Sequence, residues 1–171
     1  WDIKQDKNGI VYFANNEGLL SFDGKYWNNY PLPNKTIVRS AEIGPEGRIY
    51  VGEQDEIGYF SPGANGRLQY HSLLDLIPAK DRSFGDVWDI VSFKGNTYFR
   101  SPTKIFKFTE RSAVVFNAPG EWAFLGLCNG HLYAQDYQAG LLQFQNDMWA
   151  PVSTTNSLPA GDAVTGILPI N

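Results

Sequence analysis

One pattern of aromatic residues recurs four times along the chain. In each copy a Tyr lies toward the end of a short apolar strand, and a Phe ends a second strand ten or eleven residues later. The four tyrosines are Tyr12, Tyr50, Tyr98 and Tyr133, and the four phenylalanines are Phe22, Phe60, Phe108 and Phe144. Successive tyrosines are 38, 48 and 35 residues apart. This regularity indicates that the chain repeats one structural unit.

Strand-rich repeats of roughly 40 to 50 residues are typical of the blades of a β-propeller. We therefore predict an all-β fold: a single partial β-propeller with four blades of antiparallel strands plus the first strand of a fifth. The expected blades span approximately residues 1–36, 37–86, 87–121 and 122–162, and residues 163–171 start the next blade. An insertion after Ser72, with a short helical turn that Pro78 interrupts, explains the 48-residue spacing.

Composition and charge exclude several classes of protein. With 43% hydrophobic and 19% charged residues, the sequence favours a packed core over disorder. The formal net charge is −4 and no run of Lys and Arg is present, so we expect no nucleic acid to bind this region. No apolar run approaches the roughly 20 residues that span a bilayer, so we expect no membrane span in this region. The single cysteine, Cys128, excludes an internal disulfide.

The motifs that carry chemistry predict neither a catalytic nor a metal site. The turn at residues 6–9 resembles the start of a calcium loop with Glu17 at its twelfth position, but residues 10–13 are the core of a strand. His71 and His131 have no second His or Cys at metal-ligand spacing. No nucleophile elbow, phosphate loop or dinucleotide fingerprint is present. We therefore expect no catalytic residue, no metal and no cofactor.

Loops on a rigid scaffold are where binding usually occurs. In a propeller, the loops between second and third strands and the linkers between blades gather on one face, while the first strands lie innermost. Within these loops the sequence predicts a ligand-binding surface made of Glu53, Arg82, Asp86, Trp88 and Tyr137.

Several segments resemble the regulator-propeller repeats of Bacteroidetes sensor proteins. They are residues 8–13, 18–24, 30–34, 37–40, 47–52, 56–60, 84–88 and 140–142, together with Trp27. The resemblance runs over nearly the whole chain. In that family, two propellers of about seven blades precede a triple-tyrosine immunoglobulin-like domain, a membrane helix and an output module. The output module is a histidine kinase or a LuxR-type helix-turn-helix.

The resemblance implies a function in signal transduction. It predicts the ligand-sensing, extracytoplasmic propeller region of a two-component-type signal transduction or transcriptional regulator, periplasmic and part of a membrane-anchored protein. The ligand would be a small molecule, with glycans among the candidates, and the region would bind rather than catalyse. Two alternatives stay open: a propeller enzyme, lyase or hydrolase, that acts on carbohydrate, and a protein-interaction scaffold. No motif of the family marks its ligand residues, so none is carried over.

Both ends of the sequence fall within blade patterns, which predicts uncovered apolar surface near Ile3, Val11, Leu142 and Val164. The expected partners of that surface are the remaining propeller blades of the full-length protein. In the isolated chain we expect a homodimer in which two copies form an eight-bladed ring. The alternative is closure within one chain, with residues 163–170 pairing with the first blade.

Overall fold

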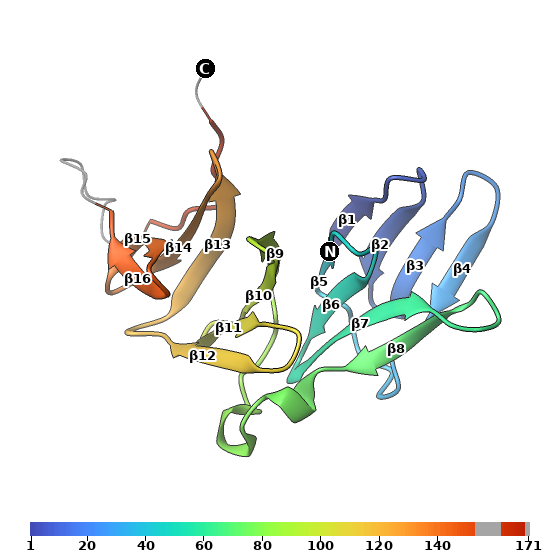
Figure 1. Cartoon of the computed structure of the whole chain (residues 1–171), viewed down its shortest axis with the longest axis horizontal. Helices are drawn as coiled ribbons and strands as arrows, with labels where there is room; N and C mark the ends of the chain where they lie inside the picture. The colour runs from blue at the N-terminus through green and yellow to red at the C-terminus, as the bar shows by residue number, and fades with distance from the viewer. Residues whose placement is uncertain (153–161, 170–171) are drawn as a thin grey trace.

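The computed structural model describes residues 1–152 and 162–169. Its sixteen strands form four separate antiparallel sheets, each made of four consecutive strands (Figure 1). This arrangement confirms the predicted fold class, an all-β propeller fragment with four blades. We number the sheets as blades 1 to 4 in chain order. In the described residues, no helix has both the length and the apolar character that crossing a membrane requires.

Each blade has short strands joined by tight turns. Blade 1 contains β1 (Asp2–Gln5), β2 (Val11–Asn15), β3 (Gly18–Phe22) and β4 (Trp27–Tyr30). Blade 2 contains β5 (Ser40–Ile43), β6 (Ile49–Glu53), β7 (Glu56–Pro62) and β8 (Leu68–Ser72). Blade 3 contains β9 (Asp89–Phe93), β10 (Asn96–Arg100), β11 (Lys104–Phe108) and β12 (Ala113–Asn117). Blade 4 contains β13 (Trp122–Cys128), β14 (His131–Asp136), β15 (Gly140–Gln145) and β16 (Met148–Pro151).

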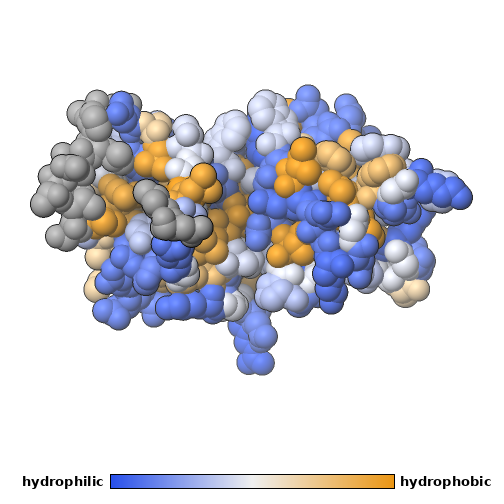
Figure 2. Space-filling view, turned by 90° about the horizontal axis from the view of Figure 1, so that it is seen from above, coloured by the Kyte–Doolittle hydropathy of each residue, from blue (hydrophilic) through white to orange (hydrophobic). Residues whose placement is uncertain are grey.

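The blades follow one another around an open arc (Figure 1). Within each blade the strands pair in chain order, so the first and fourth strands form opposite edges. The first strands β1, β5, β9 and β13 lie next to one another on the inside of the arc. Blades 1 and 4 form its two ends, and Figure 2 looks onto the open side, where apolar side chains are exposed on both arms.

The repeated aromatic residues fill the spaces between blades. Three tyrosines lie in the apolar cluster that their own blade shares with the following blade: Tyr12, Tyr50 and Tyr98. Three phenylalanines lie in the cluster shared with the preceding blade: Phe60, Phe108 and Phe144. Because side chains alternate between the two faces of a strand, the Tyr and the Phe of one blade point in opposite directions. The repeat therefore gives each sheet two apolar faces, and the sheets stack face to face.

The remaining Phe and Tyr of the repeat lie on the two faces that no other blade covers. Phe22 is half-buried and stacks on Trp27 of blade 1, whose side chain is 60% exposed. Ile3 on the same face is 62% exposed. On the far face of blade 4, Tyr133 is half-buried and Met148 is exposed. Both ends of the arc thus present apolar surface, as the sequence predicted near Ile3. The prediction was wrong for Leu142, which is 4% exposed because it packs in the cluster between blades 3 and 4.

The insertion between blades 2 and 3 forms two short 3₁₀ turns, η1 (Leu74–Leu76) and η2 (Ala79–Asp81). Ile77 and Phe84 anchor this linker in the cluster between blades 2 and 3. Asp55 secures its last part, because one carboxylate oxygen accepts the backbone N–H groups of Phe84 and Gly85 at 2.6 and 2.7 Å. The insertion therefore packs as part of the blade interface.

The C-terminal segment differs from the prediction in one detail. Residues 162–169 form no strand, whereas the first strand of a fifth blade was expected over 163–171, of which residues 170–171 lie outside the described part. A strand is defined by hydrogen bonds to a partner strand, and residues 162–169 join none of the four sheets. The segment instead lies against β14, where Gln135 bonds to the carbonyl of Asp162 and the N–H of Val164. It does not pair with blade 1, so the expected alternative of closure within one chain is not formed.

Truncating a repeat tyrosine tests the packing between blades. Tyr98 is 1% exposed and packs edge-on against Phe144 of the next blade, with ring centroids 5.4 Å apart. Tyr98→Ala is expected to lower the free energy of unfolding by roughly 3 to 5 kcal/mol, because it leaves a large cavity. Chemical denaturation measures the change, with the exposed Tyr26→Ala as the control. A loss below about 1 kcal/mol for Tyr98→Ala would contradict the assignment.

Candidate functional site

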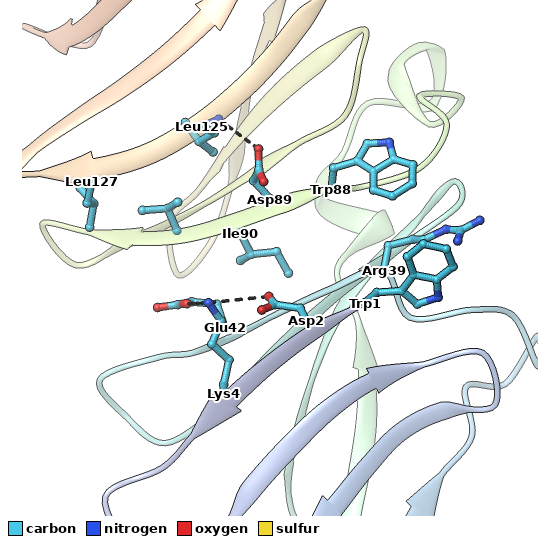
Figure 3. A pocket seen from close by; sticks show the side chains of 11 residues that line it. Trp1, Asp2, Lys4, Arg39, Glu42, Trp88, Asp89, Ile90, Leu125 and Leu127 are labelled. Atoms are coloured by element: carbon cyan, nitrogen blue, oxygen red, sulfur yellow. Dashed lines mark hydrogen bonds and ion pairs between the residues drawn. The ribbon is translucent and has the colours of Figure 1, made fainter. Parts of the chain in front are cut away.

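A cavity of about 450 Å³ opens where the first strands of the four blades meet. We call it the axis cavity; Figure 3 shows the side chains that line it, which come from β1, β5, β9 and β13 and from the residues just before β1, β5 and β9. It is lined by Trp1, Asp2, Lys4, Arg39, Glu42, Trp88, Asp89, Ile90, Val91, Leu125 and Leu127. Each blade contributes to this lining. The cavity combines aromatic, charged and aliphatic groups.

Three residues form a stack at one side of the axis cavity, which we call the Trp–Arg–Trp stack: Trp1, Arg39 and Trp88 (Figure 3). Each directly precedes the first strand of its blade, so the three occupy equivalent positions in blades 1, 2 and 3. The guanidinium carbon of Arg39 lies 4.4 Å from the ring centroid of Trp1 and 5.2 Å from that of Trp88. A cation at this distance from an indole face is attracted by the ring's quadrupole.

The linker before blade 3 completes the surroundings of the stack. The Arg39 Nε lies 3.4 Å from a carboxylate oxygen of Asp86. Trp88 is 39% exposed and Trp1 is 66% exposed, although both are large aromatic residues. Exposed indoles beside a guanidinium form a surface with both apolar area and hydrogen-bond donors, the composition expected of a ligand site.

A charged group of side chains lies along β1 and β5 within the cavity. The Lys4 ammonium is 3.4 Å from Glu42 and 3.7 Å from Asp2. Burial raises the pKa of the Glu42 carboxyl, and the neighbouring Lys4 opposes this rise. Lys4 is therefore shared between two carboxylates on adjacent blades.

Two aspartates of the cavity act as clips between blades. Asp2 accepts the backbone N–H of Ala41 at 3.1 Å, and Asp89 accepts that of Leu125 at 3.0 Å. Each bond joins the first strand of one blade to the first strand of the next. Asp89 also accepts the Arg100 Nε at 2.5 Å. These carboxylates are engaged in holding the inner strands together, and this leaves them poorly placed to move protons on a substrate.

Arg100 supports the same junction. Its Nη1 donates to the backbone carbonyl of Trp122 at 2.9 Å, and its side chain is nearly buried. In blade 2 the equivalent junction uses Ser40, whose hydroxyl donates to the carbonyl of Val87 at 2.8 Å. Different side chains thus perform the same role at each blade boundary.

The antiparallel pairing places the β2–β3, β6–β7, β10–β11 and β14–β15 turns at the same end of the blades as the inter-blade linkers. Two of the predicted ligand residues meet the axis cavity there: Trp88 lines it, and Asp86 contacts Arg39. The backbone of Glu53 is close by, because its carbonyl accepts the N–H of Val87 at 3.2 Å. The structure thus brings Trp88 and Asp86 to the axis cavity, and their role in ligand binding stays a prediction.

The Glu53 side chain does not line the axis cavity; it lies beneath the linker that leads to Arg39. It is 1% exposed, and its Oε2 accepts a hydrogen bond from Asn34 Nδ2 at 3.2 Å. Its Oε1 has no hydrogen-bond partner among the described residues. The pKa of Glu53 is raised to about 7. Burial is the main cause and nearby Glu56 adds to the rise, whereas the hydrogen bond from Asn34 opposes it. Glu53 therefore supports the linker rather than contacting a ligand in this cavity.

The other two predicted residues do not line the axis cavity. Arg82 donates from Nε to the carbonyl of Ile77 at 2.9 Å and lies 3.5 Å from Asp75, so it holds the insertion together. Tyr137 is 49% exposed on blade 4, where its N–H bonds to the carbonyl of Glu121. It remains a surface residue at the same end of the blades.

Sequence reasoning missed Arg39, Lys4 and Glu42. For Arg39 the signal was present: aligning the blades at their first strands places it between Trp1 and Trp88 in the series. Lys4 and Glu42 gave no such signal, because alternating charges on a strand usually indicate a solvated face. In this arc the inner edge of the strands encloses a cavity.

The described residues give no group of three or more His, Cys, Asp or Glu side chains that could hold a metal ion. The turn after β1, which resembled a calcium loop, uses Asp6 to accept the N–H groups of Asn8 and Ile10 at 2.9 Å each. Its carboxylate therefore caps the turn. His71 stacks on Tyr59 in blade 2, and His131 bonds to Gln143 in blade 4, so neither lines the axis cavity.

The fold of this chain is similar to that of several solved structures. The chain is similar to the extracellular domain of the putative one-component system BT4673 from B. thetaiotaomicron, with a TM-score of 0.65 and 18% identity. That match covers 91% of this chain and 22% of the other. The chain is also similar to virginiamycin B lyase from Staphylococcus aureus, with a TM-score of 0.66 and 15% identity over 90% of this chain and 55% of the lyase.

A streptogramin B lyase matches in the same way, with a TM-score of 0.65 and 17% identity over 91% of this chain and 55% of the lyase. At these identities the likeness establishes the fold, a β-propeller. The chain spans about a fifth of the length of the BT4673 domain and just over half of each lyase. No protein-family model and no curated protein matches the sequence.

The buried carboxyl of Glu53 predicts a pH dependence of stability. Its pKa of about 7 in the folded chain lies above the ordinary value of 4.5, so the folded state binds more protons between these values. Stability is therefore expected to fall as pH rises from 5 to 8, by about 1 to 3 kcal/mol from this residue.

Glu53→Gln keeps the shape of the side chain and removes its charge. The variant is expected to be more stable than the parent at pH 8, and the difference should shrink toward pH 5. Urea denaturation at several pH values measures this. A parent and variant that change in parallel with pH would show that Glu53 ionises in the folded state as it does in the unfolded chain.

Proposed function

We propose that this chain is a ligand-sensing, extracytoplasmic part of a two-component-type signal transduction regulator, and that ligand binds at the axis cavity. The observation that carries the proposal is the Trp–Arg–Trp stack: two exposed indoles and a guanidinium held at equivalent positions of three adjacent blades. Exposed large aromatics clustered in a concave site favour a binding role. The region acts by binding, and any kinase or DNA-binding output belongs to another part of the full-length protein.

The rigidity of the scaffold supports binding at this position. The backbone N–H of Arg39 bonds to the carbonyl of Gly52 at 2.8 Å, and that of Trp88 bonds to the carbonyl of Arg100 at 2.9 Å. Both side chains therefore project from backbone that is fixed by the second strand of their own blade. Pre-ordered groups lose little conformational entropy when a ligand binds.

The sensor assignment draws on the resemblance of the repeats and on one of the similar structures. The similar domain from B. thetaiotaomicron is described as the extracellular domain of a putative one-component or hybrid two-component system. By analogy we place this chain in the periplasm, as part of a membrane-anchored protein. The indoles offer flat apolar surface and the charged groups offer hydrogen bonds, and we take a glycan as the ligand class.

The rival function is that of a propeller enzyme, because two of the similar structures are lyases. The charged groups of the axis cavity favour binding instead. Asp2 and Asp89 accept backbone hydrogen bonds, and Lys4 is shared between Asp2 and Glu42. A general acid or base needs a proton that is free to reach the substrate.

Calorimetric titration with a panel of neutral and acidic oligosaccharides tests the proposal. Trp88→Ala is expected to weaken binding of the best ligand at least about tenfold, because truncating a central aromatic anchor removes much of the contact energy. Tyr26→Ala is the control, since it removes an exposed aromatic ring in the turn before β4. Absence of binding across the panel, or equal affinity of the Trp88→Ala variant, would contradict a glycan-sensing site here.

We further propose that the uncovered faces of blades 1 and 4 bind other propeller blades: those of the full-length protein, or those of a second copy when this chain is isolated. Sedimentation at micromolar concentration is then expected to give the mass of a homodimer. Ile3→Glu places a charge in the exposed face of blade 1 and is expected to yield monomers, whereas Gln69→Glu on the exposed part of β8 is the control. A parent chain that sediments as a monomer would contradict the dimer.

A further inference from the structure

We infer that Arg39 recognises an oxyanion, so that the ligand of the axis cavity is an acidic saccharide bearing a carboxylate or a sulfate ester. The inference rests on the proposed function, and it narrows the ligand class from the chemistry around a single guanidinium. The inference depends on which N–H donors of the Arg39 guanidinium have no partner among the described residues.

The two indoles cover the guanidinium from two directions. Its central carbon is 4.4 Å from the Trp1 centroid and 5.2 Å from the Trp88 centroid, and the two rings are 6.3 Å apart at 76° to each other. Because the rings are nearly perpendicular, at most one of them can lie flat against the guanidinium, and the other faces part of its edge. The part of the edge that neither ring faces remains the direction in which a partner can bind.

That edge is only partly used by the protein. The Nε group pairs with Asp86 at 3.4 Å, a long distance for a charged pair. Among the described residues, neither Nη1 nor Nη2 of Arg39 has a hydrogen-bond acceptor. Four N–H donors of the fork thus remain available beside the cavity.

The other cations of this region are already committed. Arg100 pairs with Asp89 and donates to the carbonyl of Trp122, and its side chain is nearly buried. Lys4 lies between the carboxylates of Asp2 and Glu42. Lys4 is the more exposed of the two remaining cations, at 34% against 18% for Arg39, but two carboxylates offset its charge, whereas Arg39 has one long ion pair and two indole neighbours.

A planar fork matches the geometry of an oxyanion. Guanidinium binds a carboxylate or sulfate through two parallel N–H···O bonds, which a lysine ammonium cannot reproduce. The flanking indoles strengthen these bonds because they exclude water from the charged group. A sugar ring that carries the anion would then rest against the exposed indole surface of Trp1 or Trp88.

Pairs of ligands that differ only in charge test whether the anion contributes to binding. Calorimetry would compare an oligogalacturonate with its methyl ester, which keeps the sugar rings and removes the charge, and with a neutral and a sulfated oligosaccharide. The parent chain is expected to bind the uronate or the sulfated ligand at least about tenfold more tightly than the neutral one. The arm with the higher affinity identifies the oxyanion.

Variants assign the preference to Arg39. Arg39→Gln is expected to remove the preference for the acidic ligand, and Arg39→Lys to lose most of it while keeping the positive charge. Arg67→Gln removes an exposed arginine between β7 and β8 and serves as the control for net charge. If Arg39→Gln failed to fold, the ester comparison in the parent and the Arg39→Lys variant would still decide.

The outcomes separate the two proposals. Equal binding of uronate and ester, weakened in both cases by Trp88→Ala, would overturn the role of Arg39 and leave glycan sensing in place. A preference for acids that persists in Arg39→Gln would also overturn it. No saccharide binding at all would overturn both proposals, as would Arg39-dependent binding of a free peptide carboxylate alone.

Discussion

The packing of one apolar sheet face against the next is the constraint on which this structure depends. Each blade is a small twisted sheet with apolar residues on both faces, so neither face can remain in water without cost. Tyr12, Tyr50 and Tyr98 fill one side of their blades, and Phe60, Phe108 and Phe144 fill the opposite side of the blades that follow. Each blade is therefore stabilised by a neighbour on both sides, and stacking the blades in an arc leaves only the two end faces uncovered.

This packing also creates the candidate site. When blades stack side by side, their first strands converge. Hydrogen bonds from the backbone N–H groups of Ala41 and Leu125 to the carboxylates of Asp2 and Asp89 fix the distance between these strands. Residues that precede those strands are then brought to one rim, although they are far apart in the sequence. The Trp–Arg–Trp stack is a consequence of the repeat, because the position just before the first strand supplies one of its residues in each of blades 1, 2 and 3.

The repeat made the fold predictable, because aromatic spacing reports directly which side chains share an interface. The site was predictable in part. Trp88 and Asp86 lie at the axis cavity because linkers between blades gather at one end, and a role in ligand binding stays a prediction for both. Glu53 was predicted at the binding surface, but its side chain is buried under a linker. Contacts between distant residues, such as the hydrogen bond from Asn34 to Glu53, decide which loop covers which turn. A local sequence pattern does not reveal such contacts. Arg39 was missed because its role depends on neighbours 38 and 49 positions away in the chain.

In the sensor proposed above, the composition of the stack has a consequence for how a signal could leave the site. Trp1, Arg39 and Trp88 belong to three blades, so a ligand that contacts all three binds only when those blades keep their relative positions. Binding then stabilises that arrangement by mass action, in proportion to ligand concentration over the dissociation constant. The clips at Asp2 and Asp89 oppose movement of the inner strands, whereas no comparable hydrogen bond from a neighbouring blade restrains the two end faces among the residues described. A change in ligand occupancy would therefore act on what packs against those end faces, and it is at these interfaces that binding can be coupled to the rest of a larger protein.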